Sequence, residues 1–465
     1  MSRRLRRYER EEELTKRDRG AKGSFTEHDN VSAEVRYERE VKRSRIRPAS
    51  IAVVIALGVL DGGCHSTAAD APGPRHSGAV SPTAVDSRAR ILITPSHGTK
   101  ADPAHGVSVT VKHGTLAGVT ATADGDPLEG GFGAGHTRWH STWVLTTDTH
   151  YAVRATAIDT VGRPVTRAAS FHTLAPEHTF STTIFEGYHK TYGVGMPIIL
   201  TFSTPITNKA AVERSLEIRT SRAVIGAWYW DGDRTLYFRP RTYWKADTRI
   251  DFIGHLDGVE GAPGIYGVHT LTQSWSIGRS LIAVANTQTH DVKVYLDRKL
   301  FGDWSMSAGR PGDDTPNGTY LTMEKNNPEE MVGPGYDILV PYSVRFTLSG
   351  DFIHDAYWSV DDQGFANVSH GCINLSPEHA KIYYALAVPG DPVTIEGSPK
   401  AGTWGNGWTV WFLSWSNYLE GSALHRQVRA GPNGSSVVLR PSFPPSHARP
   451  PLGTSERDNA EATAN

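Results

Sequence analysis

The chain has 465 residues, enough for about three domains, so we expect a modular protein. Its formal net charge of -1 gives no broad basic surface, and we therefore expect no nucleic-acid partner. The two cysteines, Cys64 and Cys372, exclude a disulfide framework, and separate roles for the two thiols are the simpler interpretation.

The N-terminal region predicts a disordered segment, an export signal and a tether, in that order. Residues 1–48 are rich in Arg, Lys and Glu and nearly lack aliphatic side chains, so they cannot bury enough surface to fold. The apolar run at 51–60 follows several basic residues, has the length of a signal-peptide core and is too short to span a bilayer comfortably. We expect a signal over 49–64, export of the chain, and a flexible tether over 65–88.

Cys64 ends the predicted signal. The sequence Leu60-Asp61-Gly62-Gly63-Cys64 resembles the bacterial lipoprotein signal, whose cysteine follows a small residue, receives lipid and becomes the mature N-terminus. It departs from that signal at Asp61, where leucine is usual. We expect lipidation of Cys64 and a membrane anchor. Plain signal cleavage and an uncleaved short anchor are the alternatives.

Two β modules are predicted to follow the tether. Apolar and polar residues alternate in short runs separated by Gly, Pro and Asp, which is typical of sandwich strands. The spacing predicts immunoglobulin-like domains at 89–175 and 176–278. Their tryptophans are more typical of a core than of a sugar-binding face: Trp139, Trp143, Trp228 and Trp230. The runs lie at 90–94, 107–111, 139–145, 151–157 and 168–175, then at 198–203, 216–220, 235–240 and 248–252.

Residues 279–397 predict a third strand-rich domain, so the expected fold class is mainly β with a short helix. An alternating run at 280–286 begins this domain. Ser376 and Pro377 are typical of the N-cap and first residue of a helix, which we expect to run to about Ala387. Its buried stripe is predicted to hold Ala380, Tyr383, Tyr384 and Ala387.

Cys372 is placed for chemistry more than for packing, because a histidine, a glycine and polar residues surround it. A thiol attacks a carbonyl as thiolate, and a nearby imidazole takes its proton and later protonates the leaving amine. His354, on a predicted strand, suits this role better than His370, which we expect to support the loop. Gly371 allows a sharp turn that aims successive backbone N–H groups at one point, as an oxyanion hole requires.

A zinc site is the less favoured alternative for the same residues. His354, His370, Cys372 and His379 are ligand types, but no closely spaced pair of Cys or His accompanies them. We expect no metal and no cofactor.

The order of these residues resembles that of a known family. His354, followed by Ser369-His370-Gly371-Cys372-Ile373-Asn374, is similar to the signature of the L,D-transpeptidase (YkuD-type) catalytic domain. The resemblance covers about residues 280–396.

The parts on either side also resemble actinobacterial members of that family. Those members share the lipoprotein signal, the tether and two immunoglobulin-like modules. Residues 398–426 resemble their C-terminal extension, which packs back on the enzyme through a cluster of tryptophans: Trp404, Trp408, Trp411 and Trp415. The Pro, Ser and Gly content of residues 427–465 predicts a disordered tail.

The resemblance implies an exported acyltransferase that faces the cell wall and cross-links peptidoglycan stem peptides in cell wall biogenesis. Cys372 would form a thioester with a donor stem and expel its terminal D-alanine, and the amine of a second stem would resolve it. His354 would act as base and then as acid. The backbone N–H groups of Gly371 and Cys372 would form the oxyanion hole.

The resemblance also implies a substrate site and an inhibitor class. Tyr336 and Trp358 would line the substrate, and Ser369 and Asn374 would shape its site together with His370. Carbapenem-type inhibitors would acylate the same cysteine.

Asp355 departs from the family pattern, in which Ser or Gly commonly follows the histidine. Adjacent strand residues point to opposite faces, so a Cys-His-Asp triad through its carboxylate is not expected. We expect its charge to favour the imidazolium and raise the pKa of His354. The resemblance implies that the neighbouring backbone carbonyl orients the imidazole.

Two other functions stay open. With water in place of the amine, the same thioester chemistry gives an L,D-carboxypeptidase. A non-catalytic surface protein whose three β modules bind wall polymer is the alternative from a different class.

Overall fold

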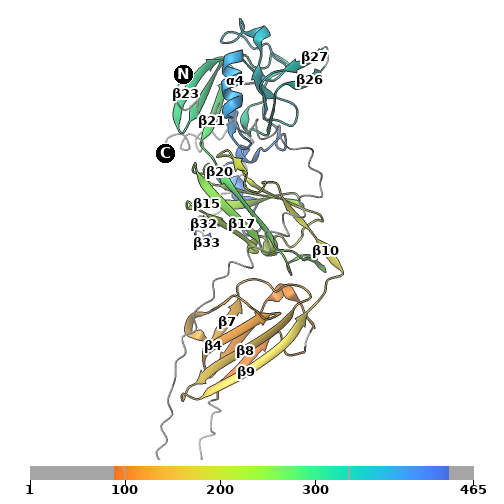
Figure 1. The fold of residues 1–465 in the computed structure, drawn as a ribbon, viewed down its shortest axis with the longest axis vertical. Coiled ribbons are helices and arrows are strands. Elements are labelled where there is room, and N and C mark those ends of the chain that lie inside the picture. The colour runs from red at the N-terminus through yellow and green to blue at the C-terminus, as the bar shows by residue number, and fades with distance from the viewer. Residues whose placement is uncertain (1–87, 99, 334–335, 439–465) are drawn as a thin grey trace, which may run out of the picture. The chain divides into compact units, whose positions relative to one another are not determined.

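The computed structural model describes residues 88–98, 100–333 and 336–438. The predicted charged segment, the signal with Cys64 and nearly all of the tether lie outside the described residues. Within the described ranges, no helix combines the length and the apolar character needed to cross a bilayer. This part of the chain is mainly β, as the sequence predicts (Figure 1).

The first module is a sandwich of two sheets. Its strands are β1 (Arg90–Thr94), β2 (Lys100–Ala101), β3 (Ser108–Lys112), β4 (Gly114–Ala123), β5 (Asp126–Pro127), β6 (Gly130–Phe132), β7 (Arg138–Ser141), β8 (His150–Asp159) and β9 (Pro164–Thr173). The sheets have the orders β1-β3-β7-β6 and β2-β9-β8-β4-β5, and the long strands β8 and β9 lie side by side (Figure 1). Val109, Leu145 and Ala155 are fully buried in its core.

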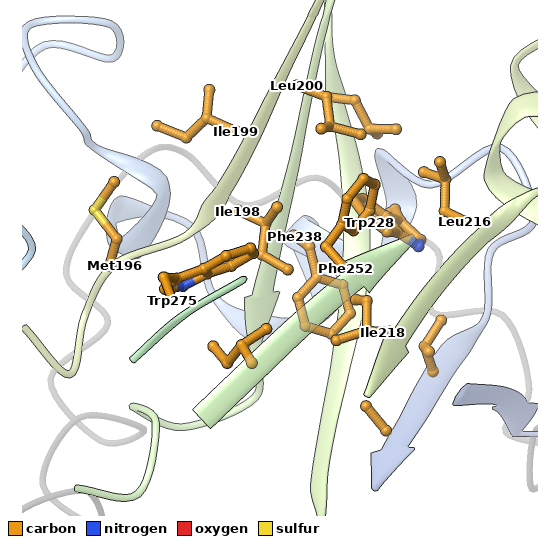
Figure 2. Packing of buried hydrophobic residues seen from close by; sticks show 14 of the residues in the cluster. Met196, Ile198, Ile199, Leu200, Leu216, Ile218, Trp228, Phe238, Phe252 and Trp275 are labelled. Carbon is orange, nitrogen blue, oxygen red and sulfur yellow. The ribbon is translucent and has the colours of Figure 1, made fainter. Parts of the chain in front are cut away.

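The second module is built on one long sheet that surrounds an apolar core. Its elements are β10 (His178–Phe180), β11 (Thr182–Ile184), β12 (Thr191–Tyr192), β13 (Ile198–Phe202), α3 (Lys209–Arg214), β14 (Leu216–Thr220), β15 (Val224–Asp231), β16 (Thr235–Pro240), β17 (Thr248–Gly254), β18 (Glu260–Ala262), β19 (Ile265–Gly267) and β20 (Leu271–Ile277). Trp228 is buried against Phe238, with ring centroids 5.1 Å apart (Figure 2). Trp139 and Trp230 are also buried, so the core prediction is confirmed for three of the four tryptophans.

The tail predicted to be disordered from residue 427 begins instead with two strands, β32 (Gln427–Gly431) and β33 (Gly434–Val438). β32 lies between β15 and β14, antiparallel to the first and parallel to the second. Val428 and Ala430 point into the core, and Ala430 is fully buried. The prediction was wrong here because composition hides a short alternating run that pairs with two distant strands. The predicted tail beyond residue 438 lies outside the described residues.

The third domain, which was predicted at 279–397, has two sheets, one hairpin and a helix. Its elements are β21 (Leu281–Asn286), β22 (Asp291–Leu296), β23 (Lys299–Ser305), β24 (Gly318–Leu321), β25 (Glu324–Asn326), β26 (Glu329–Gly333), β27 (Tyr336–Val340), β28 (Ser343–Arg345), β29 (Phe352–Asp355), β30 (Ile373–Leu375), α4 (Pro377–Leu386) and β31 (Pro392–Glu396). The sheet orders are β23-β22-β21-β31-β24 and β25-β28-β29-β30. Ala285, Val294, Val344 and Leu375 are fully buried in the core that the two sheets share.

The helix α4 forms as the sequence predicts. Ser376 is its N-cap, and the hydroxyl oxygen accepts a hydrogen bond from the backbone N–H of His379. Ala380, Tyr383 and Ala387 are buried, and α4 packs against β29. The helix therefore supports the strand that carries His354.

The C-terminal extension packs on the second module through aromatic side chains and one arginine. It includes α5 (Trp415–Glu420). The indole N–H of Trp411 donates to the carbonyl of Gly195 at 2.8 Å. Arg239, only 2% exposed, lies 4.4 Å from the ring centroid of Trp411 and 4.3 Å from that of Tyr418. These contacts are cation–π contacts inside a buried cluster, where water does not weaken them.

Glu213, on α3, fastens the end of this extension to the second module. Its side chain is buried at 4% exposure. The carboxylate accepts hydrogen bonds from the indole N–H of Trp230 (2.9 Å), the hydroxyl of Ser422 (2.8 Å) and the backbone N–H groups of Ala423 (2.6 Å) and Leu424 (3.3 Å). Three of these four donors belong to the extension.

Replacing Glu213 by alanine is expected to lower the free energy of unfolding of the second module by about 2–4 kcal/mol, because it leaves several buried donors without an acceptor. Urea unfolding followed by tryptophan fluorescence measures the change. Glu420→Ala is the matched control, since its side chain is 69% exposed. Equal unfolding midpoints for the two variants would contradict a fastening role for Glu213.

Candidate active site

Cys372 ends a tight loop that leads into β30. The hydroxyl of Ser369 donates to the carbonyl of Cys372 at 2.7 Å and accepts from the backbone N–H of Gly371 at 3.1 Å. The hydroxyl of Thr315 donates to the carbonyl of Gly371 at 2.7 Å. Gly371 has a φ of 128°, a conformation that side chains with a Cβ rarely adopt. The sharp turn predicted at this glycine is therefore present, and hydrogen bonds fix it from both sides.

His354 lies on β29, which pairs in parallel with β30. In this pairing, His354 lies opposite Asn374. The loop that ends at Cys372 therefore lies next to β29, which carries His354. His354 Nδ1 lies 2.7 Å from the carbonyl oxygen of Asp355. A carbonyl only accepts, so Nδ1 carries the proton and Nε2 keeps the lone pair that a general base needs. The backbone carbonyl orients the imidazole, as the sequence analysis expects.

Burial sets the charge state of both groups. His354 is 3% exposed, and burial lowers its pKa from 6.5 to about 4 despite the hydrogen bond from Nδ1. Burial raises the pKa of the Cys372 thiol from 9.0 to about 12. The thiol Sγ lies 3.8 Å from the carbonyl oxygen of Gly350. The free enzyme therefore holds a neutral thiol and a neutral imidazole at pH 7.

The carboxyl of Asp355 is not among the groups that raise the pKa of His354: burial lowers that pKa, and the backbone carbonyl of Asp355 offsets only part of the drop, which corrects the expectation from its charge. Its carboxyl is 5% exposed, and burial raises its own pKa, while the backbone N–H of Tyr357 is its hydrogen-bond donor. The carboxyl oxygen Oδ1 is buried without a partner in the described part of the chain. The side chain makes no hydrogen bond to the imidazole, so only the backbone of this residue serves the histidine.

Asp355→Ala is expected to keep transpeptidase activity within about threefold of the wild type, because the carbonyl that orients His354 remains. Steady-state kinetics on a donor and acceptor stem peptide measure the effect. A near-total loss in a variant with a native circular dichroism spectrum would contradict this expectation and give the carboxyl a direct role.

Aromatic side chains gather around the thiol and the imidazole. Trp358 is 47% exposed, and its ring centroid lies 5.9 Å from that of His354. Tyr336, at the start of β27, lies 4.9 Å from the exposed ring of His370. Burial raises the pKa of Tyr336, and the thiolate form of Cys372 would raise it further. These three rings surround the reacting groups as a substrate-lining wall would.

Two residues predicted to belong to the substrate site also have structural roles. Asn374 is 3% exposed, and its amide donates to the hydroxyl of Ser359 at 3.0 Å. Ser369 is 7% exposed, and its hydroxyl bonds to the backbone of its own loop. Both side chains thus shape the loop, as the resemblance implies, and their part in substrate binding stays a prediction.

Only one of the two backbone N–H groups predicted for the oxyanion hole is without an acceptor in the described part of the chain. The N–H of Gly371 donates to Ser369, whereas the N–H of Cys372 has no acceptor among the described residues. Thr315 was not predicted as a site residue, because no motif or spacing in the sequence connects it to Gly371.

The alternative zinc site does not assemble. In the described ranges, no group of three or more His, Cys, Asp or Glu side chains is arranged to hold a metal ion. His379 stacks on Trp304, with ring centroids 4.8 Å apart.

Comparison with known proteins places the site in a family. The model of the L,D-transpeptidase catalytic domain, YkuD, matches residues 280–395, and that of a bacterial Ig domain, Big_10, matches 98–260. L,D-transpeptidase 2 of Mycobacterium tuberculosis is 31% identical over 329 residues, which are 66% of this chain and 79% of the relative. The chain belongs to the L,D-transpeptidase family. The predicted family is thus confirmed, and the match ends within two residues of the predicted catalytic domain on each side.

Other L,D-transpeptidases are also similar to this chain. L,D-transpeptidase 5 of Mycobacterium tuberculosis is 34% identical over 331 residues, 68% of this chain and 73% of that protein. The solved structure of the L,D-transpeptidase LdtMt1 in complex with imipenem has 32% identity, a TM-score of 0.41, and covers 48% of this chain and 100% of that one. That of L,D-transpeptidase 3 with a faropenem-derived adduct has 29% identity, a TM-score of 0.39, and covers 46% and 97%.

Proposed function

We propose that this L,D-transpeptidase cross-links peptidoglycan stem peptides through a thioester on Cys372. The observation that carries the proposal is the pairing of β29 with β30, because it brings His354 and the loop of Cys372 onto adjacent strands. Membership of the family supports the reaction class. Both groups are neutral in the free enzyme, so we infer that the thiolate forms only as the substrate carbonyl is attacked.

In the first half-reaction, the thiol proton passes to His354 Nε2 as Sγ bonds to the carbonyl carbon of the donor stem. The oxyanion that forms accepts a hydrogen bond from the N–H of Cys372, which has no other acceptor in the described chain. When the tetrahedral intermediate collapses, the bond to the terminal D-alanine breaks, and the imidazolium gives its proton to the leaving amine. The product is a thioester and a neutral imidazole.

In the second half-reaction, the side-chain amine of an acceptor stem attacks the thioester carbonyl. It loses one proton to His354 Nε2, and the bond between carbon and Sγ breaks. The thiolate then recovers the proton from the imidazolium, which restores both neutral groups. Water in place of the amine gives the L,D-carboxypeptidase reaction with the same proton transfers.

Carbapenems are proposed as acylating inhibitors of Cys372. Their strained lactam carbonyl takes the place of the donor carbonyl, and the ring nitrogen takes the place of the leaving amine. Structures of relatives with imipenem and with a faropenem-derived adduct agree with this chemistry in the family. A mass increase confined to the peptide that contains Cys372 after incubation with imipenem tests the proposal.

We also propose that the enzyme is exported and anchored to the membrane. Export by the signal at 49–64 and lipidation of Cys64 would hold the catalytic domain outside the membrane, facing the cell wall. Both depend on residues outside the described ranges and follow from the sequence alone. Metabolic labelling with an alkyne fatty acid tests the anchor: label on the wild type and none on Cys64→Ala supports it, and equal labelling overturns it.

The test of the reaction is incubation of the pure enzyme with a disaccharide tetrapeptide, followed by mass spectrometry. A cross-linked dimer with release of D-alanine supports transpeptidation. Tripeptide without dimer identifies the carboxypeptidase. Binding of wall polymer with neither product identifies the non-catalytic alternative and overturns the proposal.

A further inference from the structure

Asp351 is a buried acid immediately before the strand of His354. Its side chain is 9% exposed. Carboxylate oxygen Oδ2 accepts hydrogen bonds from the hydroxyls of Thr347 at 2.7 Å and Ser349 at 3.1 Å. The backbone N–H of Asp351 donates to the Thr347 hydroxyl at 2.8 Å. The carboxylate is thus held in one orientation by its own turn.

The other carboxylate oxygen, Oδ1, faces the loop of the nucleophile. A Cβ added at Gly371 would overlap Oδ1 of Asp351, so the two residues are in contact through the glycine Cα. The residue before Asp351, Gly350, presents its carbonyl oxygen 3.8 Å from the Sγ of Cys372. The residue after it, Phe352, offers its backbone N–H to the same sulfur. Three consecutive residues therefore contact the nucleophile and its loop.

Several other charged or titratable groups surround this pair, and each comes from a different element. Burial is the largest influence on both groups and raises the pKa of Cys372 and of Asp351, and Arg345 on β28 and Lys400 of the extension offset part of that rise. Burial raises the pKa of Tyr320 on β24 and of Tyr336 on β27, and the charged forms of Asp351 and Cys372, respectively, raise them further. His354 is neutral, as described above. Asp351 is the acid among these neighbours whose charge disfavours the thiolate.

We propose that Asp351 is a positioning residue for the nucleophile: its carboxylate fixes the turn at Gly371 and keeps the thiol of Cys372 protonated until a substrate binds. The inference rests on the proposed role of Cys372 as nucleophile. A buried carboxylate that packs against Gly371, the residue before the nucleophile, opposes a second negative charge on the thiol, because little water lies around them to weaken the repulsion. The turn at 347–351 therefore holds the thiol in place and suppresses its reactivity in the free enzyme.

Two conservative variants distinguish the charge of Asp351 from the shape of its side chain. Asp351→Asn keeps the shape and the acceptor for the two hydroxyls and removes the charge. Asp351→Glu keeps the charge and lengthens the side chain. If charge controls the thiol, the asparagine variant changes the titration of Cys372 and the glutamate variant restores it. A purely structural role gives the opposite order.

The experiment is alkylation of Cys372 by iodoacetamide as a function of pH, resolved from Cys64 by peptide mass spectrometry. In the wild type the midpoint is expected well above the ordinary thiol value of 9.0. Asp351→Asn is expected to lower that midpoint by about one pH unit and to speed alkylation at pH 9 roughly tenfold. Asp303→Asn, an acid 51% exposed on β23, is the control and should not change the midpoint.

A midpoint for Asp351→Asn within about 0.3 pH unit of the wild type, in a folded variant, overturns the inference. If that variant does not fold, a midpoint for Asp351→Glu more than about half a pH unit below the wild type does the same. Alkylation of the free enzyme is independent of cross-linking. A shifted midpoint in an enzyme that makes no dimer therefore overturns the proposed function alone, and an unshifted midpoint in an active enzyme overturns this inference alone.

Discussion

Replacing Cys372 by serine is expected to abolish transpeptidation, with a loss on the order of 10⁴-fold or more. The site does not stabilise a negative charge on this side chain: burial already raises the pKa of the thiol to about 12. An alcohol is a far weaker acid than a thiol, so His354 would have to remove a proton that is held much more tightly. Mass spectrometry of cross-linked dimer from a disaccharide tetrapeptide measures the loss.

The second cysteine provides a matched control for this substitution. Cys64→Ser makes the same chemical change outside the catalytic domain, and the purified variant is expected to keep full activity in solution. The serine at 372 should also leave the fold intact, since the thiol contacts only the backbone of Gly350 and Phe352 among the described residues, and a hydroxyl can make the same contacts. Cross-linking by Cys372→Ser at the wild-type rate would show that another group is the nucleophile.

His354→Gln is expected to lower kcat by about 10²- to 10⁴-fold, the usual contribution of a general base. Glutamine occupies a similar volume but cannot accept and return the thiol proton. His425→Gln, whose ring is 54% exposed at the far end of the extension, is the control and should retain activity.

The pH dependence of the wild type follows from the same histidine. Its pKa of about 4 in the folded enzyme sets the acid limb of kcat/KM near pH 4, because the base is lost only when the imidazole is protonated. An acid limb near pH 6.5 that persists in the glutamine variant would assign the base to another residue.

The free energy of unfolding should also depend on the protonation of His354. Below pH 6.5 the unfolded chain takes up a proton at His354 that the folded chain refuses until about pH 4. The free energy of unfolding therefore falls as the pH falls from 6.5 to 4, by about 3 kcal/mol for this residue, and levels off below that range. His354→Gln should remove that part of the pH dependence in urea titrations.

Local sequence signals predicted much of the fold and the centre of the site. Alternating runs identified the strands, and Ser376 with Pro377 identified the start of α4. The spacing from His354 to Cys372 identified the two groups that β29 and β30 then bring together. These features depend on neighbours in the chain, which is why the sequence contains them.

What the sequence could not predict depends on contacts between distant residues. Thr315 and Asp351 touch the loop of Gly371, but neither stands in a recognisable motif. The pKa of His354 is lowered and not raised as expected from Asp355, because burial, which a sequence does not display, outweighs the rise that the backbone carbonyl of Asp355 contributes. Asn374 looks like a substrate ligand in the motif, and only its burial against Ser359 shows its structural role.

The place of β32 makes the order of synthesis matter for folding. β32 pairs with β14 and β15, and the backbone N–H of Ile218 on β14 donates to the hydroxyl of Ser435 on the neighbouring β33 at 3.0 Å, although 217 residues separate them. Until β32 emerges, β14 and β15 keep open edges that are prone to mispair. A chain cut at residue 426 would therefore retain every residue of the catalytic motif and yet be left with an unfinished sheet in the second module.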